Sequence, residues 1–200
     1  MVQQLRQALV MIVAFTLLTG LAYPLAVTGV SQVMFPAAAN GSLIVKDGKV
    51  IGSALIGQAF KSDRYFQPRP SATTDIDPND SSKTVDAPYN SASSAGSNLG
   101  PITQKLLDRV KGDVETLRGA GVVGPIPVDA VTASASGLDP HISPQTALLQ
   151  VPRVAKARGL PEERVRALVA THIEGRALGL LGEPRVNVLN LNLALDALRS

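Results

Sequence analysis

The chain has 200 residues, which is enough for one domain with a hydrophobic core and a small additional segment. It contains no cysteine, which excludes disulfides, a thiolate nucleophile and a zinc site with Cys ligands. The net charge is only +3, and the basic residues are interleaved with acidic ones instead of forming a one-sided patch, so we expect no nucleic-acid partner.

The first long apolar segment runs from Ala8 to Val30 and carries no charged side chain. As a helix it would be ~34 Å long at ~1.5 Å per residue, which is enough to span a hydrocarbon core of ~30 Å. A cleaved signal peptide is the alternative, because the small residues Ala37 and Ala39 resemble a cleavage site. The apolar region of a signal peptide is normally only ~7–15 residues long, so the segment favours an uncleaved helix across a lipid bilayer.

The charges around this segment predict its orientation. Arg6 is the only charged side chain among residues 1–39, and the next charge is Lys46. Because positive charge is retained in the cytoplasm, we expect a cytoplasmic N-terminus and an extracytoplasmic main domain. The predicted organisation is a short cytoplasmic tail at 1–7, a transmembrane helix at 8–30, a linker at 31–41 and an extracytoplasmic domain at 42–200.

Small and hydroxylated residues recur within the predicted transmembrane helix. Thr16 and Gly20 lie four positions apart and share a helix face, where small side chains allow another helix to approach closely. Pro24 lacks a backbone donor and is expected to kink the helix unless a neighbouring group compensates. The helix is either an isolated anchor or a packing helix that contacts others through Thr16, Gly20, Tyr23 and Pro24, and the spacing favours packing.

The rest of the sequence predicts an α+β domain with a β-hairpin and C-terminal helices. Two short strands are expected around Asp47-Gly48, a pair that favours a tight hairpin turn. An amphipathic helix is expected from Pro101 to Gly119, since proline is favoured at helix starts and glycine at helix ends. Between them, residues 71–98 are rich in Ser, Thr, Asn, Asp, Ala and Pro and predict a long polar loop.

This loop is interpreted in two ways. Its composition favours a flexible insert with few apolar contacts. Alternatively, the loop becomes ordered against a partner, and Tyr89 and Asn90 are then the candidate contact residues.

Helix signals dominate the C-terminal half. Ser143 is a natural N-cap and Pro144 a natural first helical residue, while Pro152 predicts a kink or a break further along. A second helix is expected from Pro161 to Gly175. A short strand is expected within 126–136, and another strand followed by an apolar helix within 185–198.

The motif Asp139-Pro140-His141 is the strongest candidate for chemistry, because Asp and His both bind zinc. The only other histidine, His172, lies on an apolar helical stripe that favours packing over metal binding. A structural interpretation is better supported: Asp139-Pro140 turns the chain and Ser143 starts the next helix. The signatures of a P-loop, a nucleophile elbow and HExxH zinc enzymes do not occur, so no catalytic residue is assigned.

Several long motifs together resemble one family. They are TLLTGLAYPL in the apolar segment, GSALIGQAF followed by YFQPRPSA, YNSASSAGSNLGP, VTASASGLDPHISPQTALLQVPRVAKARGL and HIEGRALGLLGEPRVNVLNLNLALD. In this order, over nearly the whole chain, they resemble the C subunit of the Kdp potassium-transporting ATPase.

The resemblance implies a non-catalytic accessory subunit of a high-affinity potassium pump in a prokaryotic inner membrane. The periplasmic location of the main domain comes from the charge pattern and not from the resemblance. The implied partners are a channel-like potassium-translocating subunit, a P-type ATP-hydrolysing subunit and a small single-span subunit. Asp139 and His141 join Tyr89 and Asn90 as candidate partner contacts. The alternative function is a membrane-tethered or secreted periplasmic metal-binding protein that uses Asp139 and His141.

The family is described as a catalytic chaperone that raises the ATP affinity of the pump subunit. The resemblance implies a nucleotide contact for Gln150, whereas its position in a helix beside a proline suggests an ordinary polar residue. The predicted orientation separates an extracytoplasmic Gln150 from cytoplasmic ATP. We therefore expect no stably bound cofactor, with ATP engaged only through the pump subunit.

Overall fold

The computed structural model describes residues 2–198, so the outermost ends of the predicted tail and main domain lie outside the described residues. The chain divides between Ile51 and Gly52 into an N-terminal unit and a C-terminal unit. Helices are combined with small antiparallel sheets, which confirms the predicted α+β class.

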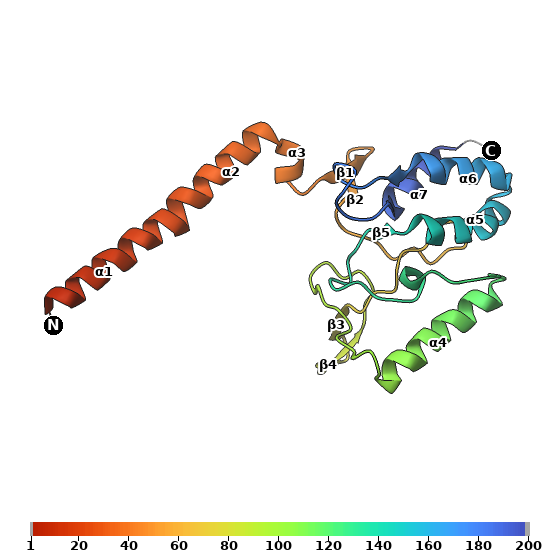
Figure 1. The fold of residues 1–200 in the computed structure, drawn as a ribbon, viewed down its shortest axis with the longest axis horizontal. Helices are drawn as coiled ribbons and strands as arrows, with labels where there is room; N and C mark the ends of the chain where they lie inside the picture. Colours follow the sequence, from red (N-terminus) through yellow and green to blue (C-terminus); the bar gives the residue numbers. More distant parts are fainter. Residues whose placement is uncertain (1, 199–200) are drawn as a thin grey trace. The chain divides into compact units, whose positions relative to one another are not determined.

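One continuous helical segment dominates the N-terminal unit (Figure 1). It consists of α1 (Val2–Leu17), the π-helical turn η1 (Leu18–Ala22) and α2 (Tyr23–Met34). None of its residues is buried, and among the described residues it is the one helix long and apolar enough to cross a membrane. The helix extends beyond both ends of the predicted span at 8–30.

The π-helical turn lies directly before Pro24. The N–H of Tyr23 donates to the carbonyl of Leu18, five residues earlier, and the Thr19 hydroxyl donates to the Phe15 carbonyl at 2.7 Å. A wider turn of this kind absorbs the disturbance that a proline introduces, because it rearranges the backbone bonds before the ring. The helix therefore continues through Pro24.

A short helix, α3 (Pro36–Ala39), leads to a hairpin of β1 (Leu43–Lys46) and β2 (Lys49–Ser53). The turn residues Asp47 and Gly48 both have positive φ, at 50° and 74°. This is the turn that Asp-Gly favours between antiparallel strands, as the sequence predicted.

Residues 71–98, predicted as a long polar loop, contain a second hairpin formed by β3 (Thr74–Asp77) and β4 (Asp80–Asp86). Its turn is supported by the Asp77 carboxylate, which accepts from the N–H of Asn79 at 2.8 Å. Such Asx turns are the local alternative to a backbone turn, which explains a hairpin in so polar a sequence. Two of the four residues of β3 and six of the seven residues of β4 are exposed.

The helix α4 (Gln104–Gly119) follows the hairpin and buries no residue, although its sequence is amphipathic. The predicted strand within 126–136 is wrong, because η2 (Val128–Ala130) forms a single 3₁₀ turn there. The Asp129 carboxylate within that turn accepts bonds from the start of the next helix, a use that an extended strand would not serve.

The core lies in the C-terminal half, where three helices pack with a three-stranded antiparallel sheet of order β5–β7–β6. The helices are α5 (Pro144–Arg158), α6 (Glu162–Thr171) and α7 (Val188–Ala197), and the strands are β5 (His141–Ile142), β6 (Ile173–Glu174) and β7 (Arg185–Asn187). Phe66 joins this core from the preceding half of the chain, with its side chain fully buried.

Two helix predictions need correction. The helix α5 is not broken at Pro152: it continues to Arg158 and ends at Gly159, whose φ of 67° suits a left-handed cap. The alternative of a kink at Pro152 stays a prediction. The helix α6 ends at Thr171, before the predicted Gly175, because Ile173 and Glu174 pair with β7 instead.

Candidate functional site

An extended segment of the C-terminal unit is held against the helical core by amide side chains. On α7, Asn192 binds both backbone groups of Phe66: the Phe66 N–H donates to Oδ1 at 2.9 Å, and Nδ2 donates to the Phe66 carbonyl at 2.9 Å. The amide thus takes the place of a neighbouring strand and satisfies two polar groups in a buried position.

Gln150, on α5, repeats this arrangement one residue later. The N–H of Gln67 donates to Gln150 Oε1 at 2.7 Å, and Gln150 Nε2 donates to the Gln67 carbonyl at 3.0 Å. We call Gln150 and Asn192, with the two backbone units they bind, the amide clamp.

Arg153 completes the surroundings of the clamp. It donates to Gln150 Oε1 at 2.6 Å and to the carbonyls of Asp63 and Tyr65 at 2.8 and 3.0 Å. Burial lowers the pKa of Arg153, while the nearby charge of Asp63 acts in the opposite direction. Gln150 Oε1 therefore accepts two hydrogen bonds from within the protein, and Nε2 donates one of its two hydrogens to a backbone carbonyl.

A cavity of about 490 Å³ lies beside the clamp, between the end of α4 and α5. Its lining includes Leu117 and Val122 on one side and Leu148 and Pro152 on the other. Gln150, Asp63 and Arg153 also line it, and Arg153 is already bonded to Gln150 and paired with Asp63. The volume falls within the range of small-molecule pockets. The bonds already made by Gln150 leave this cavity suited to apolar groups more than to a phosphate.

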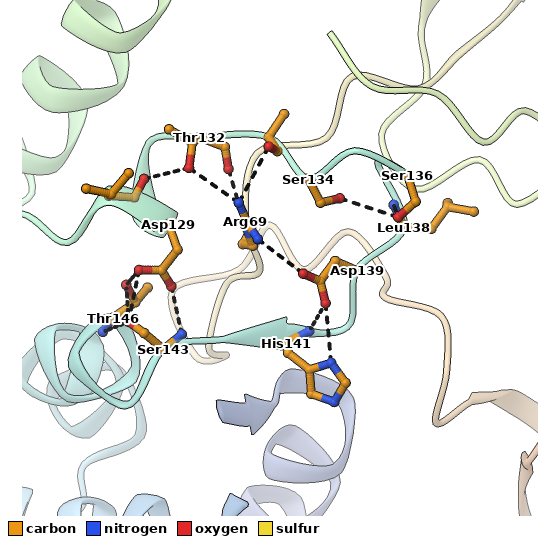
Figure 2. Close-up of polar contacts among 12 residues, drawn as sticks. Arg69, Asp129, Thr132, Ser134, Ser136, Leu138, Asp139, His141, Ser143 and Thr146 are labelled. Atoms are coloured by element: carbon orange, nitrogen blue, oxygen red, sulfur yellow. Dashed lines mark hydrogen bonds and ion pairs between the residues drawn. The ribbon is translucent and has the colours of Figure 1, made fainter. Parts of the chain in front are cut away.

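A second polar network centres on Arg69 and connects the segment after the clamp to residues 129–141 (Figure 2). Arg69 donates to the carbonyl of Thr132 at 3.3 Å and forms an ion pair with Asp139 at 3.2 Å. Burial tends to raise the pKa of Asp139, but hydrogen bonds from His141 and the charge of Arg69 outweigh it, and the pKa is lowered overall.

His141 is oriented by carboxylates. Its backbone N–H donates to Asp139 Oδ1 at 3.0 Å, its Nδ1 lies 3.3 Å from the same oxygen, and its Nε2 lies 3.9 Å from Glu174. Within residues 2–198, no group of three His, Cys, Asp or Glu side chains is arranged to hold a metal ion. The geometry is that of a turn, and the metal-binding alternative gains no support from it.

The turn leads directly into the start of α5, as the sequence predicted. The Ser143 hydroxyl oxygen accepts from the N–H of Thr146 at 3.0 Å, which is the N-cap bond. Asp129 accepts from the Ser143 N–H at 2.7 Å and from the Thr146 hydroxyl at 2.8 Å. This carboxylate at the helix start also suits the positive end of the helix dipole (Figure 2).

Tyr89 and Asn90 are brought close to the Arg69 network. The Tyr89 hydroxyl donates to the Arg69 carbonyl at 2.8 Å, and Asn90 Nδ2 donates to the Thr74 carbonyl at 2.9 Å. Burial raises the pKa of Tyr89, and the negative charge of Asp139 adds to this while Arg69 opposes it. Tyr89 therefore fastens the segment 71–98 to the rest of its domain, while Asn90 bonds within the segment, and the role of both residues as partner contacts stays a prediction.

The four residues predicted to pack against other helices lie in the separate N-terminal unit. Thr16, Gly20, Tyr23 and Pro24 are all exposed there, and Gly20 faces the Thr16 methyl across one turn. The other histidine, His172, is half-buried at the end of α6 and bonds the Leu168 carbonyl through Nδ1 at 2.8 Å.

With this geometry established, comparison with known proteins decides the family. A family model described as "KdpC: K+-transporting ATPase, c chain" matches residues 5–197. The chain belongs to the KdpC family. The match covers the apolar helix apart from its first three residues, and the described C-terminal unit apart from its last residue.

Full-length relatives agree with this assignment. The chain is 65% identical over 198 residues to the potassium-transporting ATPase KdpC subunit of Methylobacterium nodulans, with 99% of this chain and 98% of the relative covered. It is 66% identical over 197 residues to the protein of the same name in Rhodopseudomonas palustris, with 98% and 99% covered. The family inferred from sequence motifs is confirmed, and the chain is a subunit of a potassium-transporting ATPase.

Sequence reasoning missed the residues that organise this site. Asn192, Arg69 and Asp129 were not singled out, although each makes two or more bonds to other segments. A buried Asn within the apolar run of α7 was the one available signal, because a polar residue on a core face must find a partner.

Proposed function

We propose that this KdpC-family chain is a non-catalytic accessory subunit that assembles and stabilises an ATP-driven potassium uptake pump. Its proposed partners are a potassium-translocating subunit, a P-type ATP-hydrolysing subunit and a small single-span subunit. One observation carries the proposal: the family match runs from residue 5 to residue 197 and so includes nearly all of both the apolar helix and the C-terminal unit.

The accessory role is supported by how the candidate reactive groups are used. Asp139 is bonded to Arg69 and His141, and the Tyr89 hydroxyl is bonded to backbone. These contacts fix loops and helix starts and leave the chemistry of ATP hydrolysis to a partner.

We further propose that the apolar helix crosses the inner membrane with the N-terminus in the cytoplasm and the C-terminal unit in the periplasm. Arg6, as the only charged side chain before Lys46, supports this orientation. Thr16, Gly20, Tyr23 and Pro24 are the proposed contacts with helices of other subunits, since their exposed small and hydroxylated side chains allow close packing.

An effect on ATP affinity is proposed to be indirect. The oxygen of Gln150 accepts from Gln67 and Arg153, so a nucleotide that engaged it would have to compete with bonds inside the fold. The proposed orientation also separates the C-terminal unit from cytoplasmic ATP. We therefore assign Gln150 to the stability of the subunit, and through it to the stability of the assembly.

Two experiments test these proposals. Deleting the chain should prevent recovery of an intact complex and potassium-dependent ATP hydrolysis, whereas a fully active pump without it would contradict the accessory role. A reporter enzyme fused after Ser200 should be active only in the periplasm. Cytoplasmic reporter activity would reverse the orientation and reopen direct nucleotide contact by Gln150.

A further inference from the structure

The loop that connects β6 to β7 carries a concentrated apolar surface. Leu178, Leu180 and Leu181 expose 91%, 81% and 65% of their surface. Single exposed leucines are ordinary on protein surfaces, whereas three within four positions concentrate apolar surface on one loop, and the largest apolar patches of a protein are often functional. We call these three residues the leucine tip.

The leucine tip is a hydrogen-bonded structure. Ala177 and Leu181 form an antiparallel bridge in which each N–H donates to the other's carbonyl at 2.9 Å. Between them, Leu178 and Gly179 have φ values of 54° and 73°. The left-handed conformation is unfavourable for Leu178 and is maintained by the hydrogen bonds between Ala177 and Leu181. The tip therefore presents its side chains on a turn of defined conformation.

One ion pair lies between the tip and the core sheet, and a second joins the two sheet strands that carry the tip. Arg176 contacts both carboxylate oxygens of Glu183, at 2.7 and 2.9 Å, and Arg185 contacts Glu174 at 2.9 Å. Each ion pair connects the two sides of the hairpin, and the positive and negative charges cancel within each pair. The tip is therefore an apolar projection on a neutral base.

We propose that the leucine tip inserts into an apolar socket on another protein subunit of the potassium-transporting ATPase, an inference that rests on the accessory function proposed above. A membrane surface fits less well, because peripheral binding to lipid relies on free basic side chains beside the apolar ones. Residues 173–187 contain no Lys and no aromatic residue, and both arginines are paired with glutamates.

The size of the patch excludes a second copy of this chain as a sufficient partner. Three leucines offer on the order of a few hundred Å², whereas a stable interface buries about 800 Å² on each partner. The tip can therefore act as an anchor within a larger interface. Small apolar clusters contribute strongly to binding when they fill a pocket on the partner and the surrounding contacts exclude water. A subunit that is already held in the same complex meets this requirement.

Photo-crosslinking in the intact complex tests the occupant. With p-benzoyl-phenylalanine in place of Leu180, irradiation of membranes that contain the full complex should attach this chain to one other protein subunit. The same label in place of Ile102, which is 90% exposed on a different segment, is the control and should not give that product. Attachment to lipid only, to a second copy only, or to nothing would overturn the proposal.

A substitution experiment tests the energetic role. The triple variant Leu178→Asn, Leu180→Gln and Leu181→Gln should leave the unfolding midpoint of the full chain unchanged and accelerate its loss from the detergent-purified complex by about tenfold or more. The matched control is the double variant Ile102→Gln and Val123→Gln, at residues that are 90% and 92% exposed. Equal retention of the triple variant and the control would overturn the proposal.

The wild-type chain separates this inference from the function on which it rests. If the wild-type chain co-purifies with the complex while the crosslink and the retention defect are both absent, the leucine tip is not an anchor and the accessory role stands. If the wild-type chain does not co-purify with other subunits, the accessory function itself fails.

Discussion

Two parts of the C-terminal unit are built from similar sequence patterns but are held very differently. The helices α5, α6 and α7 bury residues on their apolar faces, and the amide clamp fastens an extended segment to them. The helix α4 is equally amphipathic in sequence but buries no residue, and the β3–β4 hairpin is largely exposed. Amphipathic patterning therefore predicts a helix without predicting how firmly it is held.

The difference implies uneven stability within one domain. Regions with few buried contacts open at lower free-energy cost than the core, since each residue there has little to lose on exposure. On α4, Arg109 pairs with Asp113 at 2.9 Å, yet its Nε atom is buried without a hydrogen-bond partner. We expect α4 to exchange its amide hydrogens faster than α5, and the following substitutions test this contrast.

The largest effect is expected when the amide clamp is broken. Gln150→Leu leaves the Gln67 N–H and carbonyl without their partners, and should lower the free energy of unfolding by about 2–4 kcal/mol. The measurement is urea unfolding of the full chain in detergent, followed by the near-ultraviolet circular dichroism of its tyrosines. The control, Gln145→Leu, changes an exposed glutamine on the same helix and should cost less than about 0.5 kcal/mol.

The same variant separates a structural from a nucleotide-binding role for Gln150. If the residue acts through the fold, loss of stability and any change in the ATP affinity of the pump should occur together. A Gln150→Leu chain with wild-type stability and reduced ATP affinity would contradict the structural assignment.

Helix caps give the next largest effect and compare the two parts directly. Ser143→Ala removes the N-cap bond to Thr146 and a bond to Asp129, and should lower the free energy of unfolding by about 1–2 kcal/mol. Thr103 precedes α4 but makes no side-chain cap bond, and its hydroxyl donates instead to the Gly100 carbonyl at 2.9 Å. Thr103→Ala removes that one bond and no cap, so it should cost less than Ser143→Ala, about 0.5 kcal/mol. Similar losses in both variants would show that α4 is as firmly coupled to global folding as α5.

Local signals explain what the sequence could predict. The cap at Ser143 and the hairpin turn at Asp47-Gly48 each depend on residues within a few positions of one another, and both occur as predicted. The apolar helix was recognisable for the same reason, since length and composition suffice to identify it.

Long-range pairing explains what the sequence could not predict. Gln150 and Asn192 bind backbone groups 83 and 126 positions away, and no local pattern encodes a partner at that distance. The false strand within 126–136 has a related cause: Asp129 is used by the cap of α5, 14 positions later. Pro152 suggested a kink or a break, because the sequence alone does not show the packing against other segments that keeps α5 continuous.

A substitution that stabilises α4, in place of one that destabilises it, also tests how weakly this helix is held. Gly112 lies in the interior of α4, is exposed, and has open space where a Cβ would be placed. Gly112→Ala should therefore stabilise α4 by about 0.5–1 kcal/mol, because alanine loses less conformational freedom in a helix. Hydrogen exchange should slow along α4. Unchanged exchange there would contradict the idea that helix propensity limits its stability.

The smallest expected effects concern two carboxylates whose pKa values shift in opposite directions. Burial tends to raise the pKa of Asp139, but His141 and Arg69 lower it overall from 3.8. Burial raises the pKa of Asp113 above 3.8, and Arg109 offsets this only in part. The fold therefore favours the ionised form of Asp139 and disfavours the ionised form of Asp113.

These shifts predict opposite slopes of stability against pH. Asp139 adds to the free energy of unfolding above pH ~4, and this stabilisation is lost as the pH falls through its lowered pKa in the folded state. Ionised Asp113 reduces the free energy of unfolding, and this destabilisation is relieved as the pH falls through its raised pKa in the folded state. Asp139→Asn should flatten the acid loss of stability, and Asp113→Asn should steepen it. Urea midpoints measured between pH 7 and pH 3 distinguish the two variants. If both substitutions changed the pH dependence of the midpoint in the same direction, the environments of Asp139 and Asp113 would not differ as proposed.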